Sequence, residues 1–225
     1  MESRQILHER VKPFIFVLGV PSGGTSCVAH LVRLLGVDMG KIPTTKGPHG
    51  RSYSTCEDEA FFRRVVNHHC PWHRPLPTSS PQVTALAIQE YVAFRRRQPT
   101  SAMTLGCKGW VNWGATDERF WQIPDIHVIN VVRSLEGAMK SFMKYQQAAP
   151  DHSAQAMVLA AARLGALWQM KEIAVLNNPT KIFHIDFEEL KSNPLAQVER
   201  IAKWLPHHPS DTQIGSAVIS VHQGK

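Results

Sequence analysis

A glycine-rich turn with hydroxyl side chains follows a strongly apolar segment near the start of the chain. Residues 14–26 read FIFVLGVPSGGTS. Glycines let the backbone curl so that several N–H groups point inward, and a helix that follows adds the positive end of its dipole. This pattern predicts a cradle for a phosphate group. Against the kinase and ATPase loop GxxxxGK[ST], Gly19, Gly24 and Ser26 fit, but Thr25 stands where the lysine belongs.

A second group of residues suited to phosphate follows the β-branched segment 126–132. Arg133 closes this segment, and Ser141 lies eight positions further on, about two helical turns after Ser134. The arginine supplies a forked, permanently charged donor and the serine a neutral hydroxyl, a combination that suits a terminal phosphate monoester. The alternative is that Ser134 caps a helix beside an ordinary surface arginine, and from this local pattern both interpretations stay open.

These residues need a sheet that brings the ends of several strands to one edge. The chain alternates apolar, β-branched segments with segments of helical periodicity, which predicts an α/β fold with a central parallel sheet flanked by helices on both faces. In such a sheet, ligands bind at the carboxyl ends of the strands, where Gly19, Lys108 and Arg133 fall. Strands are expected at 14–20, 103–108, 126–132 and 180–185, and helices at 25–35, 57–67, 82–97, from 135, 153–176 and 194–205.

The size and composition fit one globular domain. The chain has 225 residues, and 43% of them are hydrophobic. No change of composition along the sequence indicates a second domain. We expect a single domain over 1–225, with its core at about 13–205 and a polar C-terminal tail at 206–225. The formal net charge of +7 favours a polyanionic partner, which could be a nucleotide, a nucleic acid or an acidic glycan. The basic run 95–97 is expected to be a solvated helix end, which disfavours nucleic acid.

Neither a membrane span nor a metal is expected. The apolar segment 14–20 is too short to cross a bilayer and lacks the flanks of a signal peptide. Four cysteines without a tight pairing pattern fit reduced thiols, so we expect a soluble cytoplasmic protein. The segment 68–73, with Cys56 upstream, holds imidazole and thiol groups, but no CxxC or HxxxH spacing supports a zinc site.

The two anion motifs, in this order, resemble those of the sulfotransferases that use 3′-phosphoadenosine 5′-phosphosulfate (PAPS). The family's loop for the 5′-phosphosulfate reads P-[RK]-S-G-T-[TS], and this sequence matches it at Pro21, Gly24, Thr25 and Ser26. The family's 3′-phosphate element is an arginine that closes a strand and a helical serine eight residues later, as found within 131–141.

The resemblance extends to about residue 205, because 183–194 are similar to the family's late strand and its Y-E-D-L…P turn, and 201–205 to the helix after it. It implies a P-loop-like sulfotransferase fold and in-line transfer of a sulfuryl group from PAPS to a hydroxyl or amine. The product would be 3′,5′-adenosine bisphosphate, no metal is expected, and the acceptor, a glycan or a small molecule, is not implied. The nucleotide contacts that the resemblance implies are Pro21, Gly23, Gly24, Thr25, Ser26, Arg133 and Ser141.

One position departs from the family's loop. Ser22 stands where the family has a lysine or arginine that contacts the transferring sulfuryl group and the leaving phosphate. A serine cannot supply that charge, so another cation must stabilise the leaving group. Lys108, at the end of a central predicted strand where the family often places a lysine, is the first candidate. Lys46 or Arg51, on the exposed loop expected at 41–54, is the second.

In-line transfer also needs a base that takes the proton of the acceptor. Glu57 lies in a segment that resembles the glutamate-bearing segment of some family members, and it is our candidate. The alternative is that the acidic residues 57–59 only complement the dipole of a first helical turn. His69 and His73 are the next candidates for the base.

Two other functions stay open. A P-loop kinase of small molecules would use Asp186, after its strand, as a magnesium-side carboxylate, although Thr25 replaces the kinase lysine. A non-catalytic relative would bind a nucleotide or another polyanion through the same loop, an alternative that Ser22 and the positive net charge favour. Four tryptophans could either line a ligand pocket or belong to the hydrophobic core. They are Trp72, Trp110, Trp113 and Trp121.

Overall fold

The computed structural model describes most of the chain. The described residues are 11–41, 44–46, 52–54, 58–69, 77–109, 112–147, 153–178 and 182–222. For 44–46 and 52–54 the backbone alone is described.

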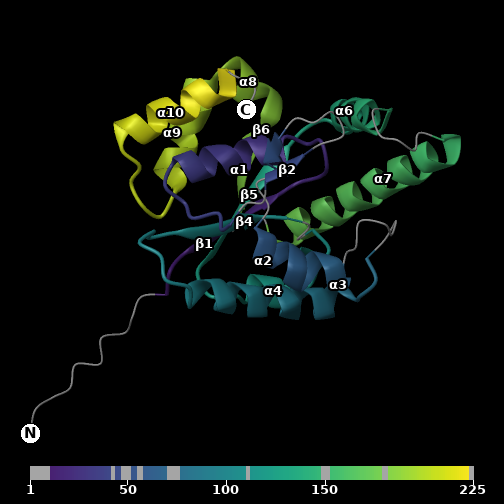
Figure 1. Ribbon diagram of the computed structural model, residues 1–225, viewed down its shortest axis with the longest axis horizontal. Helices are drawn as coiled ribbons and strands as arrows, with labels where there is room; N and C mark the ends of the chain where they lie inside the picture. Colours follow the sequence, from purple (N-terminus) through teal and green to yellow (C-terminus); the bar gives the residue numbers. More distant parts are fainter. Residues whose placement is uncertain are drawn as a thin grey trace, which may run out of the picture.

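Four parallel strands form the central sheet, in the order β4-β1-β5-β6 (Figure 1). All five side chains of β1 are buried, because helices cover both faces of the sheet. The α/β fold with a central parallel sheet, expected from the sequence, is confirmed. The strands are β1 Phe14–Leu18, β4 Leu105–Lys108, β5 Ile126–Val132 and β6 Ile182–Asp186.

Helices pack on both faces of the sheet (Figure 1). α1, α9 and α10 lie over one face, and α4 lies over the other. α6 and α7 pack against each other and against Val20, which follows β1. The bounds are α1 Thr25–Leu34, α4 Pro81–Arg96, α5 Glu118–Trp121, α6 Leu135–Gln147, α7 Ala154–Asn177, α8 Phe187–Ser192, α9 Pro194–Trp204 and α10 Asp211–His222, with a 3₁₀ turn at Gly114–Thr116.

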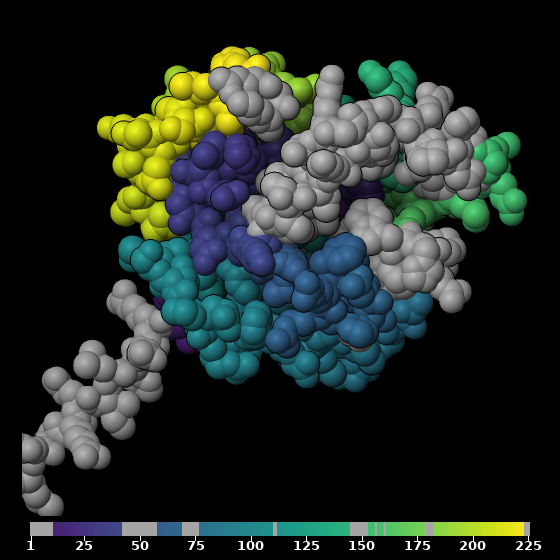
Figure 2. Space-filling model, viewed as in Figure 1, coloured from purple at the N-terminus to yellow at the C-terminus, as the bar shows by residue number. Residues whose placement is uncertain are grey.

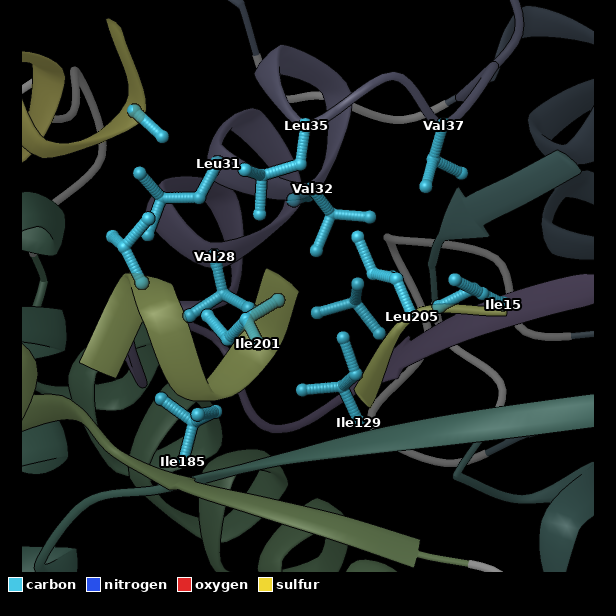
Figure 3. Close-up of a cluster of buried hydrophobic side chains, with 14 of the residues drawn as sticks. Ile15, Val28, Leu31, Val32, Leu35, Val37, Ile129, Ile185, Ile201 and Leu205 are labelled. Carbon is cyan, nitrogen blue, oxygen red and sulfur yellow. The ribbon is translucent and has the colours of Figure 1, made fainter. Parts of the chain in front are cut away.

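The side chains of β1 alternate between two core clusters, as the two-residue period of a strand requires. Ile15 and Val17 join the aliphatic cluster under α1 and α9, in which Val28 of α1 lies beside Ile201 of α9 and Ile15 lies on the side of Leu205 (Figure 3). Phe14, Phe16 and Leu18 join the second, more aromatic cluster on the side of α4. The strand that leads into the glycine-rich loop is therefore held firmly from both sides.

The segment 41–54, expected as an exposed loop, contains a small antiparallel ladder. β2 (Thr44–Lys46) pairs with β3 (Ser52–Ser54) in a register that sets Thr45 opposite Tyr53. The loop expectation is wrong for these two strands. Threonine and tyrosine favour extended backbone, and their strand propensity outweighs the lack of apolar alternation here.

The helix that follows begins at Glu59, two residues later than expected, and it is irregular. Asp58 caps it, because its Oδ1 accepts a hydrogen bond from the Ala60 N–H at 3.0 Å. A π-helical turn interrupts the α-helix after its first turn. The three pieces are α2 Glu59–Phe61, the π-helix Phe62–Val66 and α3 Asn67–His69.

The C-terminal segment, expected as a polar tail, adds a helix to the core. α10 packs against α1 and α9, and Figure 2 shows it side by side with α1 at the molecular surface. Ala217 and Val221 are buried in the aliphatic cluster, with Ile214 and Val218 packed against it. These four apolar residues recur at helical spacing, so a mostly polar segment still buries one face.

The basic run 95–97 is not a simple solvated helix end. Arg95 is 5% exposed, and its guanidinium bonds the carboxylates of Asp58 and Asp38. Arg96 donates to the carbonyls of Lys12 at 3.0 Å and Pro124 at 2.6 Å. The expectation is wrong for these two arginines, because folding brings acceptors from distant parts of the chain to the end of α4.

Candidate active site

The glycine-rich loop leaves β1 and turns sharply before α1. The Gly23 N–H donates to the Val20 carbonyl at 2.9 Å, and the backbone is left-handed at Ser22 (φ 59°) and at Gly24 (φ 93°). A left-handed serine is strained, and such strain is common in functional loops. Gly24 occupies the cap position of α1 and brings no side chain, so the positive end of the helix dipole faces the loop.

Two glycines of the loop are required by close packing. A Cβ at Gly24 would lie 2.2 Å from Cδ2 of Phe187, the first residue of α8. A Cβ at Gly19 would lie 2.3 Å from Cγ2 of Thr25. Since real Cβ atoms do not approach other atoms so closely, larger residues at either position would push the loop out of shape.

β4 brings a lysine to the loop. Lys108 pairs with Val17 in the parallel register, so both strands end at the same edge of the sheet. The Lys108 Nζ donates to the Ser26 Oγ at 3.0 Å, in the first turn of α1. A cation therefore lies next to the loop in which Ser22 takes the place of a basic residue.

β5 brings an arginine to the same loop. The Arg133 Nη1 donates to the Ser22 carbonyl at 2.6 Å, and its Nε donates to Oε1 of Glu188 at 3.1 Å. Its guanidinium carbon lies 5.0 Å from the ring centroid of Phe187. The arginine is thus held between the strained residue of the loop and α8, and it is not an ordinary surface arginine.

The start of α6 lies against this arginine. Ser134 Oγ accepts a hydrogen bond from the Gly137 N–H at 3.1 Å, so Ser134 does cap the helix. A Cβ at Gly137 would lie 3.3 Å from the Arg133 Nε, which means that Arg133 passes close over this glycine. Ser141 follows Gly137 by one turn on the same face of α6. Ser141 therefore lies on the face of α6 that Arg133 approaches at Gly137.

Asp186 has a structural task at the end of β6. Its Oδ1 accepts hydrogen bonds from the Glu188 N–H at 2.8 Å and the Glu189 N–H at 3.0 Å, and it thereby caps α8. The kinase alternative assigned this carboxylate to the magnesium side of a nucleotide site. In the structure one of its oxygens is engaged by the backbone.

Glu188 links two cations on the surface of α8. Its Oε1 accepts from Arg133 and its Oε2 from the Lys191 Nζ. The hydrogen bond from Lys191, together with the charges of Lys191 and Arg133, outweighs the effect of burial and lowers the pKa of Glu188. The carboxylate is therefore held in its charged form beside the loop.

A buried asparagine that the sequence analysis missed supports the root of the loop. Asn112 is 2% exposed, and its Nδ2 donates to the Gly19 carbonyl at 2.8 Å and to the Leu167 carbonyl of α7 at 3.3 Å. Within the described part of the chain its Oδ1 has no hydrogen-bond partner. The sequence signal was a polar residue inside the short apolar run 110–113.

Several predicted site residues cannot be placed. Glu57, Arg51 and His73 lie outside the described residues, and the side chains of Lys46 and His69 are not described. The assignment of the base therefore remains a prediction.

Two of the four tryptophans belong to the protein interior or its loops. The Trp121 Nε1 donates to the Ala115 carbonyl at 2.8 Å, and its ring is 5% exposed within the aromatic cluster. The Trp113 Nε1 donates to the Ser79 carbonyl at 2.6 Å. Trp121 thus follows the core alternative, whereas Trp72 and Trp110 lie outside the described residues.

The described residues offer neither a metal site nor a membrane-spanning helix. No three His, Cys, Asp or Glu side chains in the described ranges come together as a metal site would require. In the same ranges, no helix has the length and apolar character needed to cross a membrane.

The parallel sheet and the glycine-rich turn between β1 and α1 place this chain among the α/β proteins with a P-loop-like turn. A family model described as the sulfotransferase family matches residues 13–208, and the chain belongs to this family. The predicted family is thereby confirmed.

One solved structure supports this fold. The chain is similar to the sulfotransferase domain of the olefin synthase of Synechococcus PCC 7002, with a TM-score of 0.51 and 14% identity over 95% of this chain and 80% of that one. It is also similar to the sulfotransferase domain from the curacin biosynthetic pathway, with a TM-score of 0.49 and 16% identity over 91% and 77% of the two chains. No curated protein matches the sequence.

Proposed function

We propose that this chain transfers a sulfuryl group from PAPS to a hydroxyl or amine acceptor, which would be a glycan or a small molecule. Membership of the sulfotransferase family supports the reaction class. The observation that carries the proposal is the convergence of two cations on one glycine-rich loop. Lys108 bonds Ser26 at the start of α1, and Arg133 bonds the carbonyl of Ser22.

The residues around the loop fit a nucleotide with an anion at each end. Gly24 brings no side chain to the start of α1, so the positive end of the dipole of α1 can attract a phosphosulfate. In this assignment Pro21, Gly23, Gly24, Thr25 and Ser26 hold the 5′-phosphosulfate. Arg133, which precedes α6, and Ser141, on the face of α6 that Arg133 approaches, hold the 3′-phosphate.

PAPS would supply the activated sulfuryl group, and the chain would supply position and charge. The acceptor oxygen or nitrogen attacks sulfur in line as the bond between sulfur and the phosphate oxygen breaks. Lys108 is assigned to stabilise the negative charge that develops on that leaving oxygen, an effect worth about 3 kcal/mol for one well-placed donor in comparable sites. Glu57 is assigned to take the proton of the acceptor.

The kinase alternative is less well supported. Asp186 Oδ1 is engaged in capping α8, and Thr25 still stands where a kinase has its lysine. The non-catalytic alternative keeps one supporting observation, which is the serine at position 22.

A transfer assay separates an enzyme from a nucleotide-binding relative. The wild-type chain and Ser22→Lys are each incubated with ³⁵S-labelled PAPS and a broad panel of hydroxyl and amine acceptors, with Ser22→Ala as the matched control. The proposal expects wild-type transfer to at least one acceptor. If only Ser22→Lys transfers label, the panel contains an acceptor and the natural chain lacks a catalytic charge. The non-catalytic alternative would then replace the proposal.

A further inference from the structure

Two cations of the site share one carboxylate. Glu188 binds the Arg133 Nε through Oε1 at 3.1 Å and the Lys191 Nζ through Oε2. Both cations also lie over the ring of Phe187, with the Arg133 guanidinium carbon at 5.0 Å from its centroid and the Lys191 Nζ at 5.3 Å. Two cations therefore share one anion beside the face of an aromatic ring.

The members of this cluster differ in how firmly they are held. The side chain of Arg133 is 16% exposed, and the carbonyl of Ser22 and the backbone of Gly137 fix it on two further sides. The side chains of Glu188 and Lys191 are 53% and 48% exposed. Glu188 can therefore rotate into water, where a carboxylate is well solvated, while Arg133 keeps its place.

A phosphate group would be a stronger ligand of the two cations than this carboxylate. A phosphate monoester carries nearly two negative charges and three acceptor oxygens, so it can accept from a guanidinium and an ammonium at once. A carboxylate carries one charge, and here each of its two oxygens is already used by one cation.

We propose that Glu188 occupies the position of the 3′-phosphate in the unliganded protein, and that Lys191 is a further ligand of that phosphate once Glu188 is displaced. The inference rests on the proposed function, because it assigns this site to the 3′-phosphate of the donor nucleotide. Glu188 then acts as an internal competitor that weakens nucleotide binding, and Lys191 as a specificity-determining residue for the 3′-phosphate.

Calorimetric titration with two nucleotides tests the inference. The probes are 3′,5′-adenosine bisphosphate and adenosine 5′-monophosphate, which lacks the 3′-phosphate. Glu188→Gln removes the competing charge and is expected to tighten bisphosphate binding by about fivefold, whereas Lys191→Met is expected to weaken it by about fivefold, the size of a half-exposed charge-assisted contact. Monophosphate binding should change less than twofold in both variants. The matched controls are Glu199→Gln and Lys203→Met, on the exposed side of α9.

Three results would contradict the inference alone. In the first, both variants bind the bisphosphate as tightly as their controls do. In the second, the substitutions change the binding of both nucleotides by the same factor. In the third, Glu188→Gln binds the bisphosphate more weakly than the wild-type chain does. The last result would mean that Glu188 orients Arg133 and does not compete with the ligand. If the wild-type chain does not bind the bisphosphate at all, the proposed function fails as well, so the two failures can be told apart.

Discussion

At the scale of single residues, a cation from a neighbouring strand lies beside the glycine-rich loop. Ser22 lacks the charge that the resemblance implied for its position, and Lys108 reaches the same loop from β4 through its bond to Ser26 at 3.0 Å. The strained, left-handed backbone at Ser22 is stabilised by Arg133. The loop is thus tied to both neighbouring strands.

Replacing this lysine should lower turnover more than binding. Lys108→Met is expected to reduce the rate of transfer by about 100-fold, the loss found when one charge-stabilising donor is removed. The dissociation constant of 3′,5′-adenosine bisphosphate should change by less than about threefold, since most of the loop's donors remain. Steady-state kinetics and calorimetry measure the two effects, with Lys203→Met as control. An unchanged turnover would remove Lys108 from the mechanism.

The glycine at the start of α1 should tolerate no side chain. Gly24→Ala is expected to destabilise the fold by about 2 kcal/mol, because alanine must adopt a φ of 93° and its Cβ would overlap Phe187. Gly165→Ala on α7 is the matched control, since a Cβ there meets no atom within 4 Å, and it should stabilise the fold slightly. Urea unfolding measures both variants. Equal stability of the two would show that the loop is less tightly packed than described.

The strand-end residues of the site could be predicted from the sequence, and their partners could not. Lys108 and Arg133 were identifiable because each closes an apolar segment, and the carboxyl ends of parallel strands meet at one edge. Asn112 and Glu188 were missed. Their contacts to Gly19 and Arg133 join segments 93 and 55 residues apart, and no local pattern encodes such pairs.

At the scale of elements, the helix that follows Glu57 is anchored by a buried ionic cluster. Asp58 caps α2 and also accepts from the Tyr91 hydroxyl at 2.7 Å and from the guanidinium of Arg95. Asp58 and Arg95 are 2% and 5% exposed. The cluster therefore ties the start of α2 to α4.

Breaking this cluster should cost more than removing one of its hydrogen bonds. Asp58→Ala leaves the charge of Arg95 buried with a single carboxylate partner, Asp38, and is expected to destabilise the fold by about 3 kcal/mol. Tyr91→Phe removes one hydroxyl and should cost about 1 kcal/mol. Chemical denaturation gives both values. A cost for Asp58→Ala no larger than that for Tyr91→Phe would mean that Asp58 carries no buried charge.

The same cluster predicts a loss of stability in acid. Burial alone would raise the pKa of Asp38, but the hydrogen bond from the Gly40 N–H and the charge of Arg95 outweigh it, so the pKa is lowered. A lowered pKa stabilises the folded state above the unfolded value of about 4, and this contribution is lost as the pH falls below it. Unfolding measured between pH 7 and 3 should show a steeper loss for the wild-type chain than for Asp38→Asn. Parallel curves would contradict the prediction.

Elements with strong periodicity were predictable, and those that depend on distant partners were not. The β-branched segment of β5 has its predicted bounds, and the alanine-rich α7 differs by one residue at each end. α10 was missed because its apolar residues are diluted by polar ones, and four of them become a buried face only against α1 and α9. The antiparallel pairing of β2 with β3 was missed because neither strand alternates apolar with polar residues.

At the scale of the whole molecule, strand order explains why the site lies where it does. β1 lies between β4 and β5, so the segments that follow these three strands leave the same edge side by side. The loop after β1, Lys108 and Arg133 come from these three strands. Such an edge is the usual ligand site of open parallel sheets, and membership of the sulfotransferase family is consistent with this position.

The most direct test of the central claim is a calorimetric comparison of 3′,5′-adenosine bisphosphate with Mg-ATP on the wild-type chain and on Arg133→Ala. We expect metal-independent binding of the bisphosphate that is tighter than the binding of Mg-ATP. Arg133→Ala should weaken bisphosphate binding by more than about 1.5 kcal/mol, the scale of a charge-assisted hydrogen bond. An absence of bisphosphate binding, or tighter binding of Mg-ATP, would contradict the assignment of this site to PAPS.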